Sequence, residues 1–137
     1  MLVNCTFPTY SFAYLQTLTY LELPKGVAGF SGSGQTISYC SSLKTLKLPN
    51  TFSLVIQAYH IRDNEELTEI ILENGWNCSA NFSNCNNLTS SSMVAMFNAL
   101  KNLTGQTSKT LTLGSTNLSK LTSSQIAIAT SKNWTVS

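Results

Sequence analysis

The chain has 137 residues, close to the size of one domain, and 42% of them are apolar, enough to build a continuous core. Only 10% are charged, the net charge is +2, and Lys and Arg form no cluster, so nucleic-acid binding is not expected. No stretch approaches the roughly eighteen consecutive apolar residues of a membrane helix, and the opening MLVNCTF lacks the regions of a secretory signal. We therefore predict neither a membrane span nor a signal peptide in this chain.

A repeated pattern occupies the first two thirds of the chain. Residues 12–24 read FAYLQTLTYLELP, and residues 37–49 read ISYCSSLKTLKLP. A third copy, IRDNEELTEIIL, covers 61–72 without the proline, and a weaker fourth, FSNCNNLTSSSM, covers 82–93. The strand core alone returns in SKTLTL, from residue 108, and in SKNWTV, from residue 131. With residues 18, 43, 67, 88, 108 and 131 as anchors, the spacings are 25, 24, 21, 20 and 23 residues.

Spacings of about 20–29 residues with L-x-x-L-x-L are typical of leucine-rich repeats, in which each turn adds one strand to a parallel sheet. We therefore predict an α/β fold, a leucine-rich-repeat-like right-handed solenoid with one parallel sheet of about six short strands. Equivalent apolar residues should stack in three ladders, because a single turn cannot bury them alone. The ladders are Leu18, Leu43, Leu67 and Leu88; Leu21, Leu46, Ile70, Leu111 and Trp134; and Leu23, Leu48, Leu72, Met93, Leu113 and Val136.

Two short helices are expected in the C-terminal turns. Apolar residues at helical spacing from Met93 to Leu103 predict an amphipathic helix from about Ser91 to Lys101. A capping box, Thr122 to Gln125, opens a second helix that is apolar on most sides and is expected to be sandwiched. The predicted organisation is a single domain, 1–137, with repeat turns in 1–90 and a helix-containing C-terminal cap in 91–137.

Residues 12–24 and 37–49 resemble the BspA-type leucine-rich repeats of gut and oral bacteria and of some protists. The tail from about Leu88 is similar to the C-terminal end of such proteins in intestinal Firmicutes and their phages. The resemblance implies a non-enzymatic adhesion or binding protein at the cell surface or secreted. Leu15 and Asn64 stand where the repeat has cysteine, and the third and fourth copies lack the proline, so the resemblance does not extend to a particular ligand.

The residues that could take part in catalysis or metal binding do not combine into a recognisable site. His60 is the sole histidine and lacks the partners of a catalytic triad, so we expect a solvated connector. GFSGSGQT, 29–36, lacks the Gly-Lys-Ser/Thr of a phosphate loop and is interpreted as an insertion loop. The four cysteines form no CxxC pair, and Cys40 and Cys85 are expected to be buried free thiols. The acidic residues of 63–73 form no calcium loop, so they are expected to be solvated surface. No enzyme activity, metal or cofactor is predicted.

The middle residue of each L-x-L should point to the open, concave face of the sheet, because side chains alternate along a strand. This places Tyr20, Thr45, Glu69, Ser90 and Thr110 in one row and Glu22, Lys47, Ile71, Ser92, Thr112 and Thr135 in the next. Glu22 and Lys47 should form an ion pair across adjacent strands. Trp76, in the turn ENGW, is a further candidate for an exposed aromatic contact. The predicted binding residues are Tyr20, Glu22, Thr45, Lys47, Glu69, Ile71 and Trp76.

Two functions are compatible with these residues. The first is a binding or adhesion module of a bacterial surface or secreted protein, whose open face contacts a protein or glycan. The alternative is a structural or assembly cap of a longer surface or phage tail protein, because the chain begins with an abrupt apolar turn while its C-terminal turns carry helices. The exposed first strand would then offer an edge for self-association.

Overall fold

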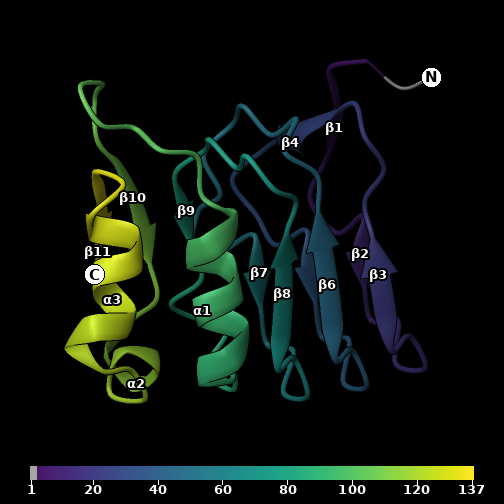
Figure 1. The fold of residues 1–137 in the computed structure, drawn as a ribbon. Coiled ribbons are helices and arrows are strands. Elements are labelled where there is room, and N and C mark those ends of the chain that lie inside the picture. Colours follow the sequence, from purple (N-terminus) through teal and green to yellow (C-terminus); the bar gives the residue numbers. More distant parts are fainter. Residues whose placement is uncertain (1–2) are drawn as a thin grey trace.

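The computed structural model describes residues 3–137 and shows a small α/β protein whose strands run beside three helices (Figure 1). The two rows of short strands that make up the repeat region lie one behind the other, with the apolar core between them. In chain order the elements are β1 (Cys5–Phe7), β2 (Phe12–Ala13), β3 (Tyr20–Glu22), β4 (Val27–Phe30), β5 (Ile37–Ser38), β6 (Thr45–Leu48), β7 (Ile61–Arg62), β8 (Glu69–Leu72), β9 (Ala80–Asn81), α1 (Ser90–Ala99), β10 (Lys109–Thr112), α2 (Ser115–Leu118), α3 (Ser123–Thr130) and β11 (Trp134–Val136).

The strands of residues 3–137 are divided among four separate parallel sheets. These are β3-β6-β8, β2-β5-β7, β9-β10-β11 and the pair β1-β4. The prediction of a leucine-rich-repeat-like solenoid with one sheet of about six strands is therefore wrong. The first three copies pair their L-x-L strands in one sheet, the fourth copy interrupts the row with a helix, and the strands of the last two copies pair in a separate sheet.

The register predicted for the first three copies is confirmed. Leu21 lies opposite Leu46, which lies opposite Ile70, so that one apolar ladder runs across β3, β6 and β8. Side chains along β6 and β8 alternate between buried and half-buried, which is the pattern of a sheet packed on one face.

The fourth copy forms α1 instead of a strand. Thr89 caps the helix, because its Oγ1 accepts a hydrogen bond from the amide of Ser92 at 3.1 Å. The hydroxyl of Ser92 in turn accepts from the amide of Ile70 at 3.1 Å, so the first turn of α1 covers the free edge of β8. The predicted helix is confirmed, although it begins and ends earlier than expected, and Met93 enters the core from a helix rather than from a strand.

The last two strands pair in a register that differs from the prediction by two residues. Leu111 was expected opposite Trp134, but it lies opposite Val136, and Lys109 lies opposite Trp134. A shift of two residues leaves the same side chains on the same face of a strand, so the apolar pattern alone did not distinguish these two registers. The indole of Trp134 donates to the carbonyl of Lys101 at 2.8 Å and fixes the observed one.

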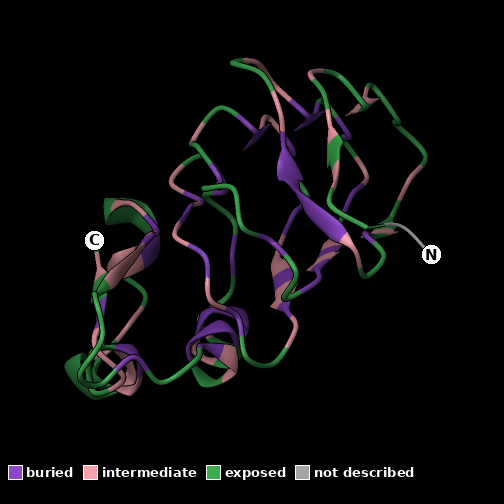
Figure 2. Cartoon of the chain, turned by 90° about the horizontal axis from the view of Figure 1, so that it is seen from above, coloured by how far each residue is buried: buried purple, intermediate pink, exposed green. Residues whose placement is uncertain are grey.

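The capping box at the start of α3 is confirmed, with Thr122 and Gln125 making reciprocal hydrogen bonds. The helix is not sandwiched, however. One side of α3 faces solvent, because Ala127 is exposed whereas Ala129 is buried. Figure 2 shows exposed residues along this helix. Just beyond α3, the ammonium of Lys132 donates to the carbonyls of Phe97, Asn98 and Leu100 at 2.8 to 3.1 Å. Lys132 therefore caps the C-terminal end of α1 from outside that helix.

The glycine-rich segment is only partly a loop. Gly29 belongs to β4, which pairs with β1, and the loop covers the residues that follow Phe30. Gly29 has a φ of +147°, and a Cβ there would lie 2.7 Å from the Cβ of Leu54. The close approach of residues 53 and 54 to this strand therefore requires glycine.

The repeat position three residues before the anchor leucine forms a polar ladder inside the core. The thiol of Cys40 donates to the carbonyl of Phe12 at 3.2 Å, and the amide of Asn64 donates to the carbonyl of Ile37 at 3.0 Å. The thiol of Cys85 makes the equivalent contact with Ile61 at 3.7 Å. Each of these side chains thus bonds to the leading apolar residue of the preceding copy. All four cysteines are free, and Cys40 and Cys85 are buried, as predicted.

Candidate functional site

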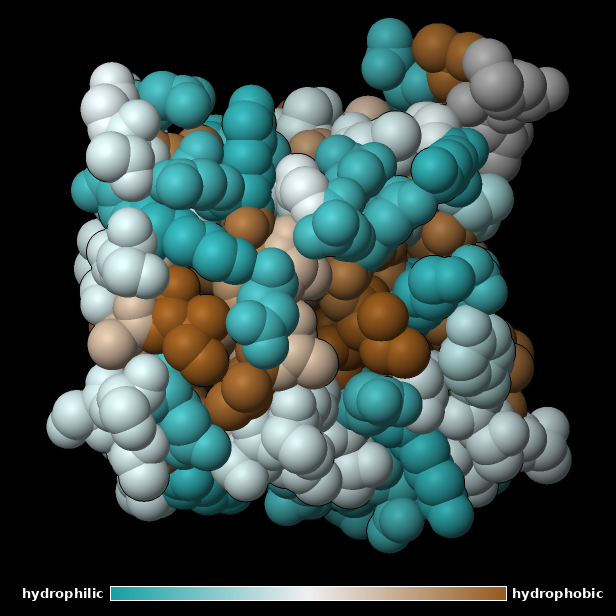
Figure 3. Space-filling model, viewed as in Figure 1, coloured by the Kyte–Doolittle hydropathy of each residue, from teal (hydrophilic) through white to brown (hydrophobic). Residues whose placement is uncertain are grey.

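The open face of β3, β6 and β8 brings six of the seven predicted binding residues together. Because side chains alternate along these strands, the ladder of Leu21, Leu46 and Ile70 points to the core and the residues on either side of it point outward. Figure 3, drawn from the same side as Figure 1, shows hydrophobic residues surrounded by hydrophilic ones. The six residues, all exposed or half-buried, are Tyr20, Glu22, Thr45, Lys47, Glu69 and Ile71.

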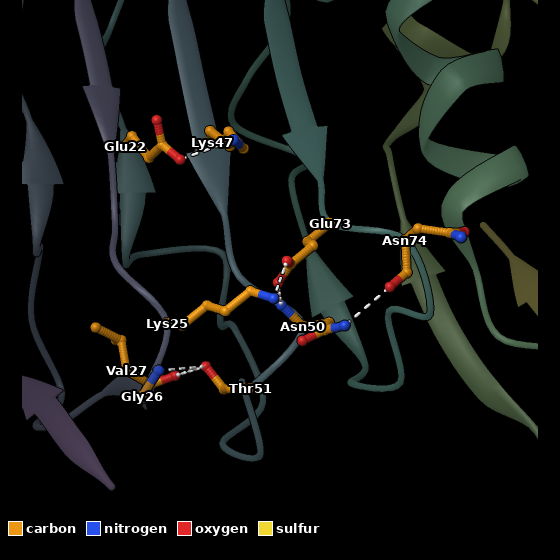
Figure 4. A network of polar contacts seen from close by, with 9 residues as sticks. All are labelled: Glu22, Lys25, Gly26, Val27, Lys47, Asn50, Thr51, Glu73 and Asn74. Atoms are coloured by element: carbon orange, nitrogen blue, oxygen red, sulfur yellow. Dashed lines mark hydrogen bonds and ion pairs between the residues drawn. The ribbon is translucent and has the colours of Figure 1, made fainter. Parts of the chain in front are cut away.

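Polar side chains on this face bond to one another across the strands. The ammonium of Lys47 lies 2.7 Å from Glu22, as predicted (Figure 4). The hydroxyl of Tyr20 donates to the same carboxylate at 2.9 Å. The hydroxyl of Thr45 donates to Glu69 at 3.0 Å. The hydrogen bond from Lys47 lowers the pKa of Glu22, and the bond to Glu22 raises the pKa of Tyr20. The face therefore carries an ionised pair beside a tyrosine that is 47% exposed.

A second polar cluster lies where the same three strands end, and it was not predicted. Lys25 reaches across the sheet to Glu73, with the two charged atoms 2.9 Å apart, and the backbone amide of Asn50 donates to Glu73 at 3.0 Å (Figure 4). The ammonium of Lys25 is the largest cause of the lowered pKa of Glu73. A signal for this cluster was present, because Lys25 and Asn50 both follow the Leu-Pro that ends a copy.

The two clusters enclose an open hollow of about 130 Å³. Its lining combines two ion pairs with the apolar surface of a leucine and a proline. Such a lining suits a ligand group that offers both hydrogen-bonding and apolar atoms. The lining residues are Glu22, Leu23, Lys25, Lys47, Pro49 and Glu73.

Trp76 does not belong to this face. It was predicted to be an exposed contact, but it is fully buried, its indole donates to the carbonyl of Cys78 at 2.6 Å, and its ring packs beside Phe52. The later members of the two predicted rows also lie elsewhere. Ser92 is buried at the start of α1, and Thr110, Thr112 and Thr135 stand in the sheet of β9, β10 and β11.

An exposed pair of tyrosines was missed. The rings of Tyr14 and Tyr39 stack with centroids 4.9 Å apart and planes 12° from parallel. Both residues occupy the position four before the anchor leucine, and this shared position was the available signal. Both have positive φ, 61° and 55°, an uncommon conformation for a bulky residue. The pair lies at the ends of β2 and β5 rather than on the open face.

His60 is buried, so the prediction of a solvated connector is wrong for this residue. Its Nδ1 accepts from the amide of Gln57 at 3.1 Å, and its ring makes edge contacts with Phe30 and Tyr59. Asp63, the candidate partner, forms an ion pair with Arg62 at 2.6 Å. Burial lowers the pKa of His60, which favours the neutral ring.

The burial of His60 predicts that acid destabilises the protein. The folded pKa lies below the unfolded value of about 6.5, so the unfolded chain binds more protons between the two values. The free energy of unfolding should therefore be largest above pH of about 6.5 and fall as the pH drops toward the folded pKa. Urea unfolding at a series of pH values measures this slope.

A His60→Gln variant is the control for this slope. The variant should lose the slope just below pH of about 6.5 and keep only the decline at lower pH, where carboxylates such as Glu73 are protonated. An unchanged slope in the variant would assign the effect to other groups.

Within residues 3–137 the structure shows an unreactive thiol at Cys85 and no cluster of metal ligands. Burial raises the pKa of Cys85 to about 12, so this thiol is not a nucleophile at neutral pH. No group of three or more His, Cys, Asp or Glu side chains in this range is arranged to hold a metal ion. None of the helices in residues 3–137 has the length and apolar character needed to cross a bilayer.

Comparison of the chain with protein-family models, with curated proteins and with solved structures gave no match. The resemblance to BspA-type repeats stays a prediction from the sequence.

Proposed function

We propose that the chain is a non-enzymatic binding module whose open face contacts a protein or a glycan. The observation that carries the proposal is the in-register placement of an exposed tyrosine, a half-buried isoleucine and an ion pair on three adjacent strands, with Tyr20, Ile71 and Lys47 as the central residues. By the resemblance to BspA-type repeats, we also propose a cell-surface or secreted location.

The side chains of this face are held in place before any ligand arrives. Lys47 and Tyr20 both bond to Glu22, and Thr45 bonds to Glu69, so few rotamers remain to be fixed on binding. Fixing fewer rotamers lowers the entropic cost of association. Tyrosine supplies contact area at a low cost in conformational entropy, which is why it is frequent in binding surfaces. The face thus has the physical properties of a preorganised recognition surface.

The test is a screen of the purified chain against arrays of bacterial and host surface proteins and glycans, followed by a titration of each hit. A variant with Tyr20→Ser, Lys47→Ser and Ile71→Ser together should weaken binding by about 100-fold, a typical loss when central contacts are removed. The matched control is Lys101→Ser, an exposed lysine after α1. It should bind like the wild type.

Equal affinity of the triple variant and the wild type, with both folded by circular dichroism, would reject the open face as the contact. A hit that loses affinity in the control variant instead would move the contact to the α1 side of the molecule.

A further inference from the structure

The first copy of the repeat presents two open sheet edges at the same end of the molecule. In residues 3–137, β3 ends the order β3-β6-β8, and β2 ends the order β2-β5-β7. Figure 1 shows β3 as the outer strand beside β6, with β2 behind it. The two strands belong to one copy, and the segment of residues 14–19 connects them.

Backbone hydrogen-bonding groups point out of both edges. The amide of Leu23 donates to Lys47, and the carbonyl of Thr19 accepts from β6, so the odd-numbered residues of β3 face β6. Alternate residues of a parallel strand bond to the same neighbour, and Tyr20 and Glu22 therefore direct their N–H and C=O groups outward. On β2, the amides of Phe12 and Tyr14 donate to β5, which leaves the N–H and C=O of Ala13 facing outward.

The apolar ladders are also incomplete at this end. Leu18 and Leu21 are only partly buried, whereas Leu43 and Leu46, their equivalents in the second copy, are fully buried. Leu15 is 42% exposed, although Cys40 at the same repeat position is inaccessible to solvent. The second copy covers one side of the first, and within residues 3–137 nothing covers the other side in the same way.

Two of the usual protections of an open edge, proline and unpaired charge, are missing here. Exposed edge strands are commonly protected by lysines, prolines or unpaired charges that prevent pairing with another chain. From Phe12 to Glu22 the sequence FAYLQTLTYLE contains no proline and one charged residue. That residue, Glu22, is already neutralised by Lys47 at 2.7 Å. Two identical edges can therefore approach without repulsion between like charges.

We propose that this end binds a second copy of the chain, edge to edge, around a two-fold axis. A partner that pairs with both edges has to offer two strand edges arranged like β2 and β3, and a second copy of the chain does so. A two-fold contact brings the same surface of both copies together. With the axis at Leu21, β3 pairs antiparallel with its equivalent, and Tyr20 exchanges both backbone hydrogen bonds with Glu22 of the partner subunit. The β2 edges pair at the same time through Ala13.

The first experiment measures the mass of the wild-type chain by sedimentation equilibrium from about 1 to about 500 µM, since dimerisation depends on concentration by mass action. The mass should rise from one copy to two across this range. A mass of one copy at every concentration overturns the proposal.

Amide hydrogen exchange locates the contact without a variant. The amides of Ala13, Tyr20 and Glu22 should exchange more slowly as concentration rises, because each becomes a donor to the second copy. The amide of Thr116, exposed at the far end of the chain, should not respond. Dimerisation that leaves the three edge amides unchanged would place the contact elsewhere and also overturn the proposal.

An Ala13→Pro variant removes an outward donor without removing a bond within the chain. It should raise the dissociation constant by about tenfold or more, since the two-fold axis makes the loss occur twice. The Lys101→Ser variant should dimerise like the wild type. An unchanged constant in folded Ala13→Pro rejects pairing through β2, and if the variant does not fold, the exchange of the wild type decides.

Discussion

Replacing Trp76 with alanine is expected to lower the free energy of unfolding by about 3–5 kcal/mol, the usual cost of truncating a fully buried aromatic side chain. Trp76 is among the largest side chains that are entirely buried, and its ring lies 5.5 Å from that of Phe52. The substitution creates a cavity in the core and also leaves the carbonyl of Cys78 without its donor. Urea denaturation followed by circular dichroism measures the loss.

Two further substitutions give free energies of unfolding with which the loss in Trp76→Ala can be compared. Trp76→Phe keeps most of the ring volume and loses the indole donor, so it should cost less than the alanine variant. Tyr59→Ala removes an aromatic side chain that is partly exposed, and it should cost about 1 kcal/mol. A loss below about 1 kcal/mol for Trp76→Ala would mean that the residue is not in the core, and it would return as a candidate contact.

Replacing Asn64 with alanine is expected to cost about 2–3 kcal/mol, because two buried backbone groups lose their partners at once. The side-chain oxygen of Asn64 accepts from the amide of Cys40 at 3.0 Å, and its nitrogen donates to the carbonyl of Ile37 at 3.0 Å. Both backbone groups belong to fully buried residues, so the substitution removes the partners that the fold provides for them. Equilibrium urea unfolding provides the measurement.

The matched controls come from the chain itself. Asn64→Cys copies the second and fourth repeats, so it keeps the donor to Ile37 and loses only the acceptor, and it should cost about half as much as alanine. Asn87→Ala removes an exposed asparagine that bonds to the carbonyl of Glu65, and it should change stability by less than about 0.5 kcal/mol. Equal losses for Asn64→Ala and Asn87→Ala would show that the internal ladder contributes little.

The sequence was sufficient to predict the parts of the fold that rest on repetition. The alignment of Leu21 with Leu46 and Ile70 fixed the register of three strands, and it therefore also identified the ion pair of Glu22 with Lys47. The capping box at Thr122 identified the start of α3, because its signal lies within four adjacent residues. Six of the seven predicted binding residues consequently lie on one face.

The parts of the fold that the sequence did not predict depend on competition between local helix signals, strand pairing and contacts between distant residues. In the fourth copy, an N-cap at Thr89 and helical spacing from Met93 favoured a helix over a fourth strand, and this divided the predicted sheet. Trp76 and His60 look solvent-exposed in the sequence, because polar neighbours surround them. Their burial follows from loops that fold back over Phe52 and Phe30, a contact that no local pattern contains.

The hydrogen bonds of Lys132 have a consequence for the order of folding. This lysine holds the last carbonyls of α1, although it lies 35 residues after Phe97 in the chain. During synthesis, the helix end therefore has no such partner until residue 132 has been made, and α1 should fray from that end in any shorter nascent chain. The contact forms late relative to the helix that it caps, so the C-terminal end of α1 is completed by a side chain made 35 residues after Phe97.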